Sequence, residues 1–110
     1  MVEALWSFEF ESSLGDQGAG VVVLETDRLV GGDAQYFYIG KYKVENRILE
    51  AEVVVQHYAG VPFSIFGPSE IHKIILQGEV NIPVMKLQGH LANDPSRTFS
   101  IKCVKRADLP

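Results

Sequence analysis

The sequence predicts an all-β protein in which eight short antiparallel strands curl around one core, as an up-and-down barrel or a tight sandwich. Apolar and polar side chains alternate with period two, as in Trp6-Ser7-Phe8-Glu9-Phe10, which is typical of strands with one buried and one solvated face. Turns rich in glycine, proline, asparagine and aspartate separate these runs, and none of the runs has helical periodicity. Closure into a barrel would remove the exposed strand edges.

Four strands are expected in the first half of the chain, over residues 4–12, 19–26, 29–30 and 36–45. In the second of these strands, the run from Val21 through Val23 to Leu24 is apolar at every position. Such a run indicates either burial on both faces or contact with another subunit, and both interpretations stay open. Val21 and Val23 are therefore candidates for a dimer or partner surface.

Gly31, Gly32 and Asp33 predict a structural corner between the third and fourth strands. Two adjacent glycines allow positive φ without steric cost, and an aspartate carboxylate hydrogen-bonds nearby backbone amides in an Asx-type turn. No helix pattern follows, so a loop that cradles phosphate is disfavoured. Gly40, inside the fourth strand, predicts a bulge, a bend or a place where a ring packs on backbone.

The second half of the chain is expected to contribute four more strands. Pro83 lacks the N–H that a strand ladder needs, so it is expected at a strand start or an edge. The turn at residues 93–96 leads into the last strand. The expected strands cover residues 47–58, 71–78, 82–87 and 97–106.

The segment at residues 59–69 breaks the alternation with glycine and proline, yet it carries Val61, Phe63, Ile65 and Phe66. It is too apolar for a solvated connection, because exposed side chains of this kind would form an adhesive patch. We expect it to contact a second copy or a partner protein. Burial within the monomer is the alternative.

The side chains expected inside the barrel are bulky, which favours a packed interior over a hollow one. The alternative is an interior that holds one small apolar molecule, since such sites combine apolar walls with a few polar groups. Tyr38, Tyr42 and His72 are the candidate polar groups for a cavity of this kind. The expected interior side chains are Trp6, Phe8, Phe10, Phe37, Leu49, Val53, Ile74, Leu76, Phe99 and Ile101.

The 110 residues fit a single domain, 1–110, whose core needs no disulfide or metal. The net charge of -4, with lysine and arginine spread singly, argues against direct binding to nucleic acid. The first residues lack the basic start of a signal peptide, and no apolar run approaches the roughly 20 residues that span a bilayer. We therefore expect a cytoplasmic protein without a membrane segment, and the single cysteine, Cys103, fits a reducing compartment.

No residues with the spacing of a catalytic or metal site stand out, so neither a cofactor nor an enzymatic activity is expected. The three histidines are scattered and form no HxH or HExxH motif. Glu50 and Glu52 share one strand face, which a general acid and base could use, but a solvated strand face is the more common arrangement. Ser12 and Ser13 lie outside a GxSxG motif, which leaves nucleophilic catalysis without support.

Landmarks along residues 5–80 resemble those of the GrlR-like regulators of proteobacteria. They are the strand LWSFEFES, the glycine turn into GAGVVVLE, the corner VGGDAQYFYIGKYKV, the strand ILEAEVVVQHY and the motif SIFG. The most specific of them is Gly31-Gly32-Asp33, followed by Tyr38 and by Gly40-Lys41-Tyr42. The resemblance implies a lipocalin-like eight-stranded barrel that forms a homodimer. In the founding member, that dimer binds a transcriptional activator of a type III secretion system and holds it inactive.

One landmark departs from the family pattern. The founding regulator carries an acidic Glu-Asp-Glu-Asp run between its fourth and fifth strands, which is thought to engage the activator. The matching stretch here is Val44-Glu45-Asn46-Arg47, with one acid and one base. We therefore expect a non-enzymatic regulatory or interaction protein that binds an unidentified partner protein as a homodimer, and the alternative is a β-barrel that binds a small apolar ligand.

Overall fold

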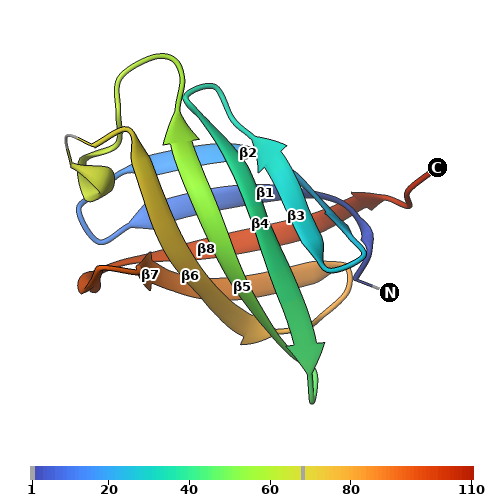
Figure 1. The fold of residues 1–110 in the computed structure, drawn as a ribbon. Helices are drawn as coiled ribbons and strands as arrows, with labels where there is room; N and C mark the ends of the chain where they lie inside the picture. The colour runs from blue at the N-terminus through green and yellow to red at the C-terminus, as the bar shows by residue number, and fades with distance from the viewer. Residues whose placement is uncertain (1, 68) are drawn as a thin grey trace.

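The protein is a closed barrel in a computed structural model that describes residues 2–67 and 69–110. Eight strands follow one another around the barrel, and each is antiparallel to its neighbours, including β1 to β8 (Figure 1). The prediction of an all-β, up-and-down, lipocalin-like barrel is confirmed. The strands are β1 (Ala4–Ser12), β2 (Gln17–Glu25), β3 (Arg28–Gly32), β4 (Tyr36–Glu45), β5 (Ile48–His57), β6 (Ile71–Glu79), β7 (Val84–Leu91) and β8 (Asp94–Ala107), and the 3-10 helix η1 (Ser64–Phe66) lies between β5 and β6.

The period-two pattern of the sequence separates the two faces of the barrel wall. In β1, the side chains of Trp6, Phe8 and Phe10 are buried, whereas Glu9 and Glu11 are exposed. Tight two-residue turns join β2 to β3 and β4 to β5, and both residues of each turn have positive φ. This geometry matches the right-handed twist of paired strands. Within residues 2–67 and 69–110, no helix has the length and apolar character that crossing a membrane requires.

The glycines of the predicted corner serve a different purpose from the one expected. Gly31 and Gly32 belong to β3, and neither has φ in the left-handed region. A Cβ at Gly31 would collide with the carbonyl oxygen of Val21, and a Cβ at Gly40 would collide with the carbonyl oxygen of Glu52. Close approach of neighbouring backbones, not positive φ, therefore requires these glycines.

Of the alternatives for Gly40, the bulge is wrong. β4 pairs with β3 and with β5 without a shift of register. The irregularities lie in the pairings of β8, at Leu5/Trp6 with β1 and at His90/Leu91 with β7. Pro83 directly precedes β7, as expected for a residue that cannot donate to a ladder.

Nearly all of the side chains expected inside the barrel are buried there. Phe37 is the exception, since it lies on the outer face and is partly exposed. The reason is the alternation itself: Tyr36 is buried and Tyr38 packs against the core, so the residue between them points outward. The largest fully buried side chains are Trp6, Tyr36, Leu49, Ile65, Met85 and Val55.

Candidate functional site

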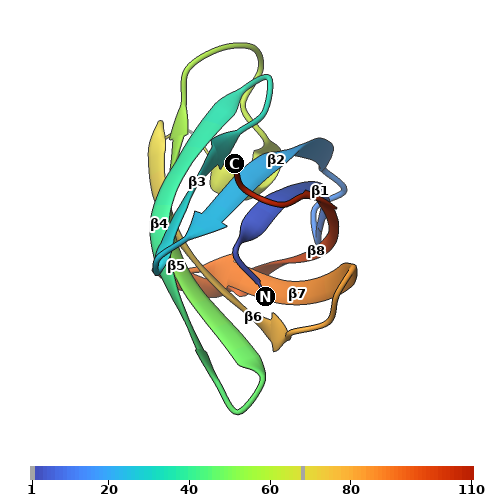
Figure 2. The same ribbon diagram turned by 90° about the vertical axis from the view of Figure 1, so that its right-hand side faces the viewer.

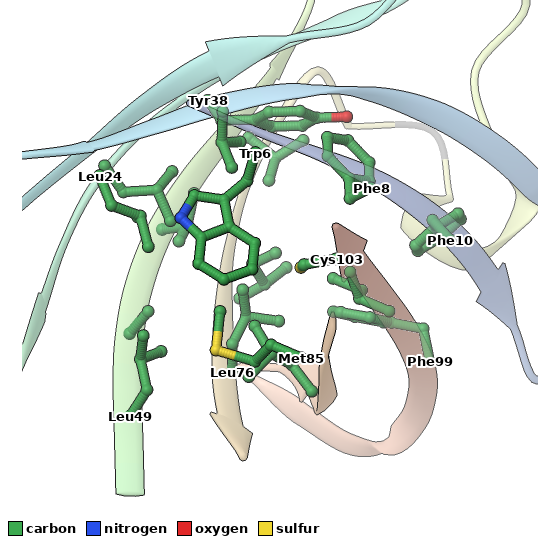
Figure 3. A pocket seen from close by; sticks show the side chains of 18 of the residues that line it. Trp6, Phe8, Phe10, Leu24, Tyr38, Leu49, Leu76, Met85, Phe99 and Cys103 are labelled. Atoms are coloured by element: carbon green, nitrogen blue, oxygen red, sulfur yellow. The ribbon is translucent and has the colours of Figure 1, made fainter. Parts of the chain in front are cut away.

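The strands enclose a cavity of about 70 Å³ inside the barrel. Figure 3 shows Trp6 and Phe8 of β1, Met85 of β7 and Phe99 of β8 converging on this space. The lining is aromatic, aliphatic or sulfur-containing, and Tyr38 contributes its one hydroxyl group. The interior is therefore mostly filled by side chains, and the space that is left is apolar.

Of the three polar groups proposed for a cavity, Tyr38 alone lies in its lining. Tyr42 is buried but does not line the space. His72 stacks its ring on Phe66, at a centroid distance of 4.9 Å, and is also not part of the lining. The prediction of a cavity role is therefore wrong for Tyr42 and His72.

The carboxylate of Asp33 organises the connection between β3 and β4. Its Oδ1 accepts hydrogen bonds from the backbone N–H groups of Gln35 at 2.8 Å and Tyr36 at 2.7 Å. Its Oδ2 accepts a hydrogen bond from the hydroxyl of Tyr38. These contacts form the Asx-type turn expected at this position, and they connect the turn to the wall of the cavity.

The phenol of Tyr38 is expected to make the fold less stable as the pH rises into the alkaline range. Burial, together with the hydrogen bond and the negative charge of Asp33, raises the pKa of Tyr38 well above its usual value. The folded state therefore keeps the proton at a pH where an unfolded tyrosine, with a pKa of about 10, loses it. The contribution of Tyr38 to stability is complete below about pH 10 and is lost as the pH rises above it.

We expect the free energy of unfolding to fall with pH between pH 10 and 11, with Tyr38 contributing up to about 1.4 kcal/mol per pH unit. Urea denaturation at a series of pH values, followed by fluorescence, measures this slope. Tyr38→Phe should give a shallower slope in the same range, whatever its stability at pH 8. Equal slopes for the two proteins would contradict the assignment to Tyr38.

The segment between β5 and β6 closes one end of the barrel, and we call residues 61–67 the plug segment. Ile65 is fully buried, Phe66 is 6% exposed, and the half-buried Phe63 lines the cavity together with Phe66. The prediction of a dimer or partner surface is therefore wrong for Phe63, Ile65 and Phe66, which are covered within the monomer. Val61 is 79% exposed.

Aromatic rings seat the plug segment in the mouth of the barrel. Phe63 stacks on Phe10 with a centroid distance of 5.3 Å. Tyr36 contacts Phe63 at 5.3 Å and Phe66 at 5.0 Å, and its hydroxyl accepts a hydrogen bond of 2.8 Å from the N–H of Phe63. Rings from β1, β4 and the plug segment thus form one cluster above the cavity.

Two charged side chains fix the backbone of the plug segment. Asp16, just before β2, accepts hydrogen bonds from the N–H groups of Ser64 at 2.9 Å and Ile65 at 2.8 Å. Arg97 of β8 donates a hydrogen bond of 2.9 Å to the carbonyl oxygen of Ile65. No local pattern in the sequence marks Asp16 or Arg97, because their partners lie 32 to 49 residues away in the chain. In Figure 1, η1 lies beside the β1–β2 turn, as these contacts require.

A second candidate site is an exposed apolar surface on the outside of the barrel. In Figure 2, β3, β4 and β5 form one wall, opposite the side that contains β1, β7 and β8. Val23, Val30, Ile39 and Val54 lie directly opposite one another on neighbouring strands from β2 to β5. We call this surface the outer apolar face; it consists of the half-buried Val23 and the exposed side chains of Val21, Val30, Phe37, Ile39 and Val54.

The acidic residues weighed as catalytic candidates form ion pairs on the outside of the barrel. Glu50 lies 3.7 Å from Nζ of Lys43, and Glu52 pairs with Lys73. The hydrogen bond and charge of Lys73 lower the pKa of Glu52. Glu50 and Glu52 therefore lie on a solvated strand face, which is the more common arrangement for residues with their spacing.

Neither a metal site nor a reactive thiol emerges from the geometry. Within residues 2–67 and 69–110, no group of three or more histidine, cysteine, aspartate or glutamate side chains could hold a metal ion. Cys103 is buried in the core, and burial raises the pKa of its thiol to about 12. It is therefore a packing residue.

Comparisons with known proteins leave the chain to be interpreted from its own geometry. Neither protein-family models nor curated proteins match it. The cavity beneath the plug segment and the outer apolar face are the two features on which a function can be argued.

Proposed function

We propose that this chain is a non-enzymatic interaction protein that acts as a homodimer, with the outer apolar face as the contact between two copies. The observation that carries the proposal is the row of directly paired apolar side chains across four strands. Ile39, at its centre, is 57% exposed. Water-facing strand surfaces normally carry polar side chains, so an apolar row of this length indicates a surface that is covered in the working protein.

The size and surroundings of this face suit a second copy. Its exposed side chains adjoin Tyr58, which is 58% exposed and whose ring centroid lies 6.3 Å from that of Phe37, and a standard interface covers about 800 Å² per partner. Lys41 and Glu52 lie opposite each other in the next row, and they would supply polar area at the rim. An apolar centre with a polar rim is the usual composition of a protein interface. Two such sheet faces can pack about 10 Å apart.

The resemblance to the GrlR-like regulators supports the same class of function, a dimeric barrel that captures another protein. In this chain, Asn46 and Arg47 form a tight two-residue turn between β4 and β5. The turn carries no acidic run, so it would not attract a basic partner. We therefore propose a regulatory partner protein whose docking does not depend on strong positive charge.

Analytical ultracentrifugation of the wild type and of Ile39→Asp tests the proposal. The wild type should sediment as a dimer at micromolar concentration, and Ile39→Asp should sediment as a monomer, because the change places a charge at the centre of the interface. Ile82→Asp is the matched control, since Ile82 is 45% exposed but lies between β6 and β7, away from the outer apolar face. A monomeric wild type, or an Ile39→Asp variant that stays dimeric, would overturn the proposal.

A further inference from the structure

We propose that the barrel interior is a binding site for an uncharged apolar molecule, which enters by displacing the plug segment. This inference is independent of the proposed dimer, because it concerns the inside of the barrel and not its outer wall. It rests on how the plug segment is attached, on what its rings occupy, and on the chemistry of the cavity lining.

The plug segment can leave the barrel without breaking the wall. Residues 61–67 belong to none of the eight strands, so their departure removes no ladder hydrogen bond. Gly60 directly precedes the exposed Val61, and Gly67 follows the buried residues of the segment. Both glycines have positive φ, at 69° and 68°. Rotation about the backbone dihedral angles of such glycines can reorient a segment at little steric cost. Segments outside the hydrogen-bonded ladders open locally at a lower free energy than the strands around them.

Hydrogen bonds from polar side chains hold the backbone of the plug segment. Asp16 accepts a hydrogen bond from the N–H of Ile65 and Arg97 donates one to its carbonyl oxygen, and both are side chains near the surface. The apolar part of the attachment consists of the fully buried Ile65 and of the rings of Phe63 and Phe66, which pack against Phe10 and Tyr36. An apolar guest that takes the place of these rings can compensate for the contacts that they lose.

The rings of the plug segment occupy the space that a guest would need. The cavity of about 70 Å³ is smaller than the roughly 150 Å³ apolar cavity that holds a benzene molecule. Phe63 and Phe66 line this cavity directly, so their withdrawal would join their own volume to it. A molecule larger than benzene therefore requires displacement of the plug segment.

The lining determines the chemical class of the guest. The hydroxyl of Tyr38 already donates to Asp33, and the indole N–H of Trp6 donates to the carbonyl oxygen of Val2 at 2.8 Å. Among the residues described around it, the cavity thus offers no charged side chain, and the donor left free is the weak S–H of Cys103. A charged group would be desolvated there without compensation, so the guest is an uncharged molecule with an apolar ring or chain.

Trp6 is the only tryptophan of the chain and lines the cavity, so its fluorescence reports on a guest. We expect n-butylbenzene and 1-octanol to change Trp6 emission in a saturable manner, and octanoate to bind at least tenfold more weakly than 1-octanol at pH 7.5. Hydrogen exchange should show the N–H groups of Ser64 and Ile65 losing protection when n-butylbenzene is bound. That loss distinguishes displacement of the plug segment from entry of a guest beneath it.

Gly18→Ala provides the variant test. A Cβ at Gly18 would lie 2.9 Å from the ring of Phe63, so it should push the plug segment outward without touching Asp16 or Arg97. We expect this variant to bind n-butylbenzene at least fivefold more tightly, because its binding-competent state is more populated. Ala19→Ser, at the adjacent exposed position of β2, is the matched control and should bind like the wild type.

A thermal melt establishes that Gly18→Ala folds; if it does not, Arg97→Met replaces it with the same expectation, since methionine has no N–H group to donate to the plug backbone. The proposal would be overturned if neither the wild type nor the loosened variant showed a saturable change in Trp6 emission up to the solubility limit of the probes. Binding that leaves the Ser64 and Ile65 amides fully protected would overturn it as well. The dimer proposal is tested separately by sedimentation, and neither outcome there affects this one.

Discussion

Replacing Phe66 by aspartate is expected to destabilise the fold by about 4 kcal/mol or more, enough to unfold many small domains. The side chain is 6% exposed, and its ring lies between Tyr36 and His72 at centroid distances of 5.0 and 4.9 Å. The substitution removes these ring contacts and places a carboxylate next to an apolar cavity that offers it no partner. Urea denaturation followed by Trp6 fluorescence measures the loss.

Val61→Asp is the matched control for this prediction. Val61 belongs to the same plug segment but is 79% exposed, so its change to aspartate should alter the free energy of unfolding by less than about 0.5 kcal/mol. The comparison separates burial from mere position in the loop. A Phe66→Asp variant that keeps the wild-type denaturation midpoint but loses a dimer would instead restore the interpretation of Phe66 as a subunit contact.

The plug segment shows which part of the site the sequence could predict. The run from Val61 to Phe66 is apolar enough that something must cover it, and this requirement was predictable from composition. What covers it was not predictable, because a loop folded into its own barrel and a loop buried between subunits need the same residues. The three-dimensional path of the chain between β5 and β6 decides this, and no local pattern encodes that path.

The strands were more predictable, because alternation reports directly on the two faces of a wall. Trp6, Phe8 and Phe10 share a parity, and all three face the interior. The prediction that Phe37 lies inside is wrong, because the parity set by its tyrosine neighbours points it outward. Periodicity therefore outweighs hydrophobicity at a single position of a closed sheet.

The contacts that hold the plug segment had no signal in the sequence. Asp16 lies in a glycine-rich turn and Arg97 follows a proline turn, where charged side chains are ordinary solvated groups. Their roles arise only because the barrel brings the β1–β2 turn and the start of β8 to the same mouth. Long-range hydrogen bonds of this kind depend on closure of the barrel, which a linear pattern does not contain.

Replacing Asp33 by alanine is expected to lower the free energy of unfolding by about 3 kcal/mol, because three donors lose their acceptor together. These donors are the N–H groups of Gln35 and Tyr36 and the hydroxyl of Tyr38. The last of them is the most costly, since the phenol is largely buried and alanine leaves it without a partner. Thermal and urea denaturation of the variant measure the loss.

Asp33→Asn and Tyr38→Phe separate the parts of this effect. Asparagine keeps an acceptor for the turn amides and a group that can bond the phenol, so it should cost about 1 kcal/mol. In Tyr38→Phe, the buried hydroxyl is already gone, so adding Asp33→Ala should cost only the turn hydrogen bonds. The double-mutant cycle should therefore show a coupling of 1 kcal/mol or more, roughly the worth of one buried hydrogen bond to a carboxylate. Additive losses would mean that Asp33 stabilises the corner but not the cavity wall, and a loss below about 0.5 kcal/mol for Asp33→Ala would contradict the role of the carboxylate altogether.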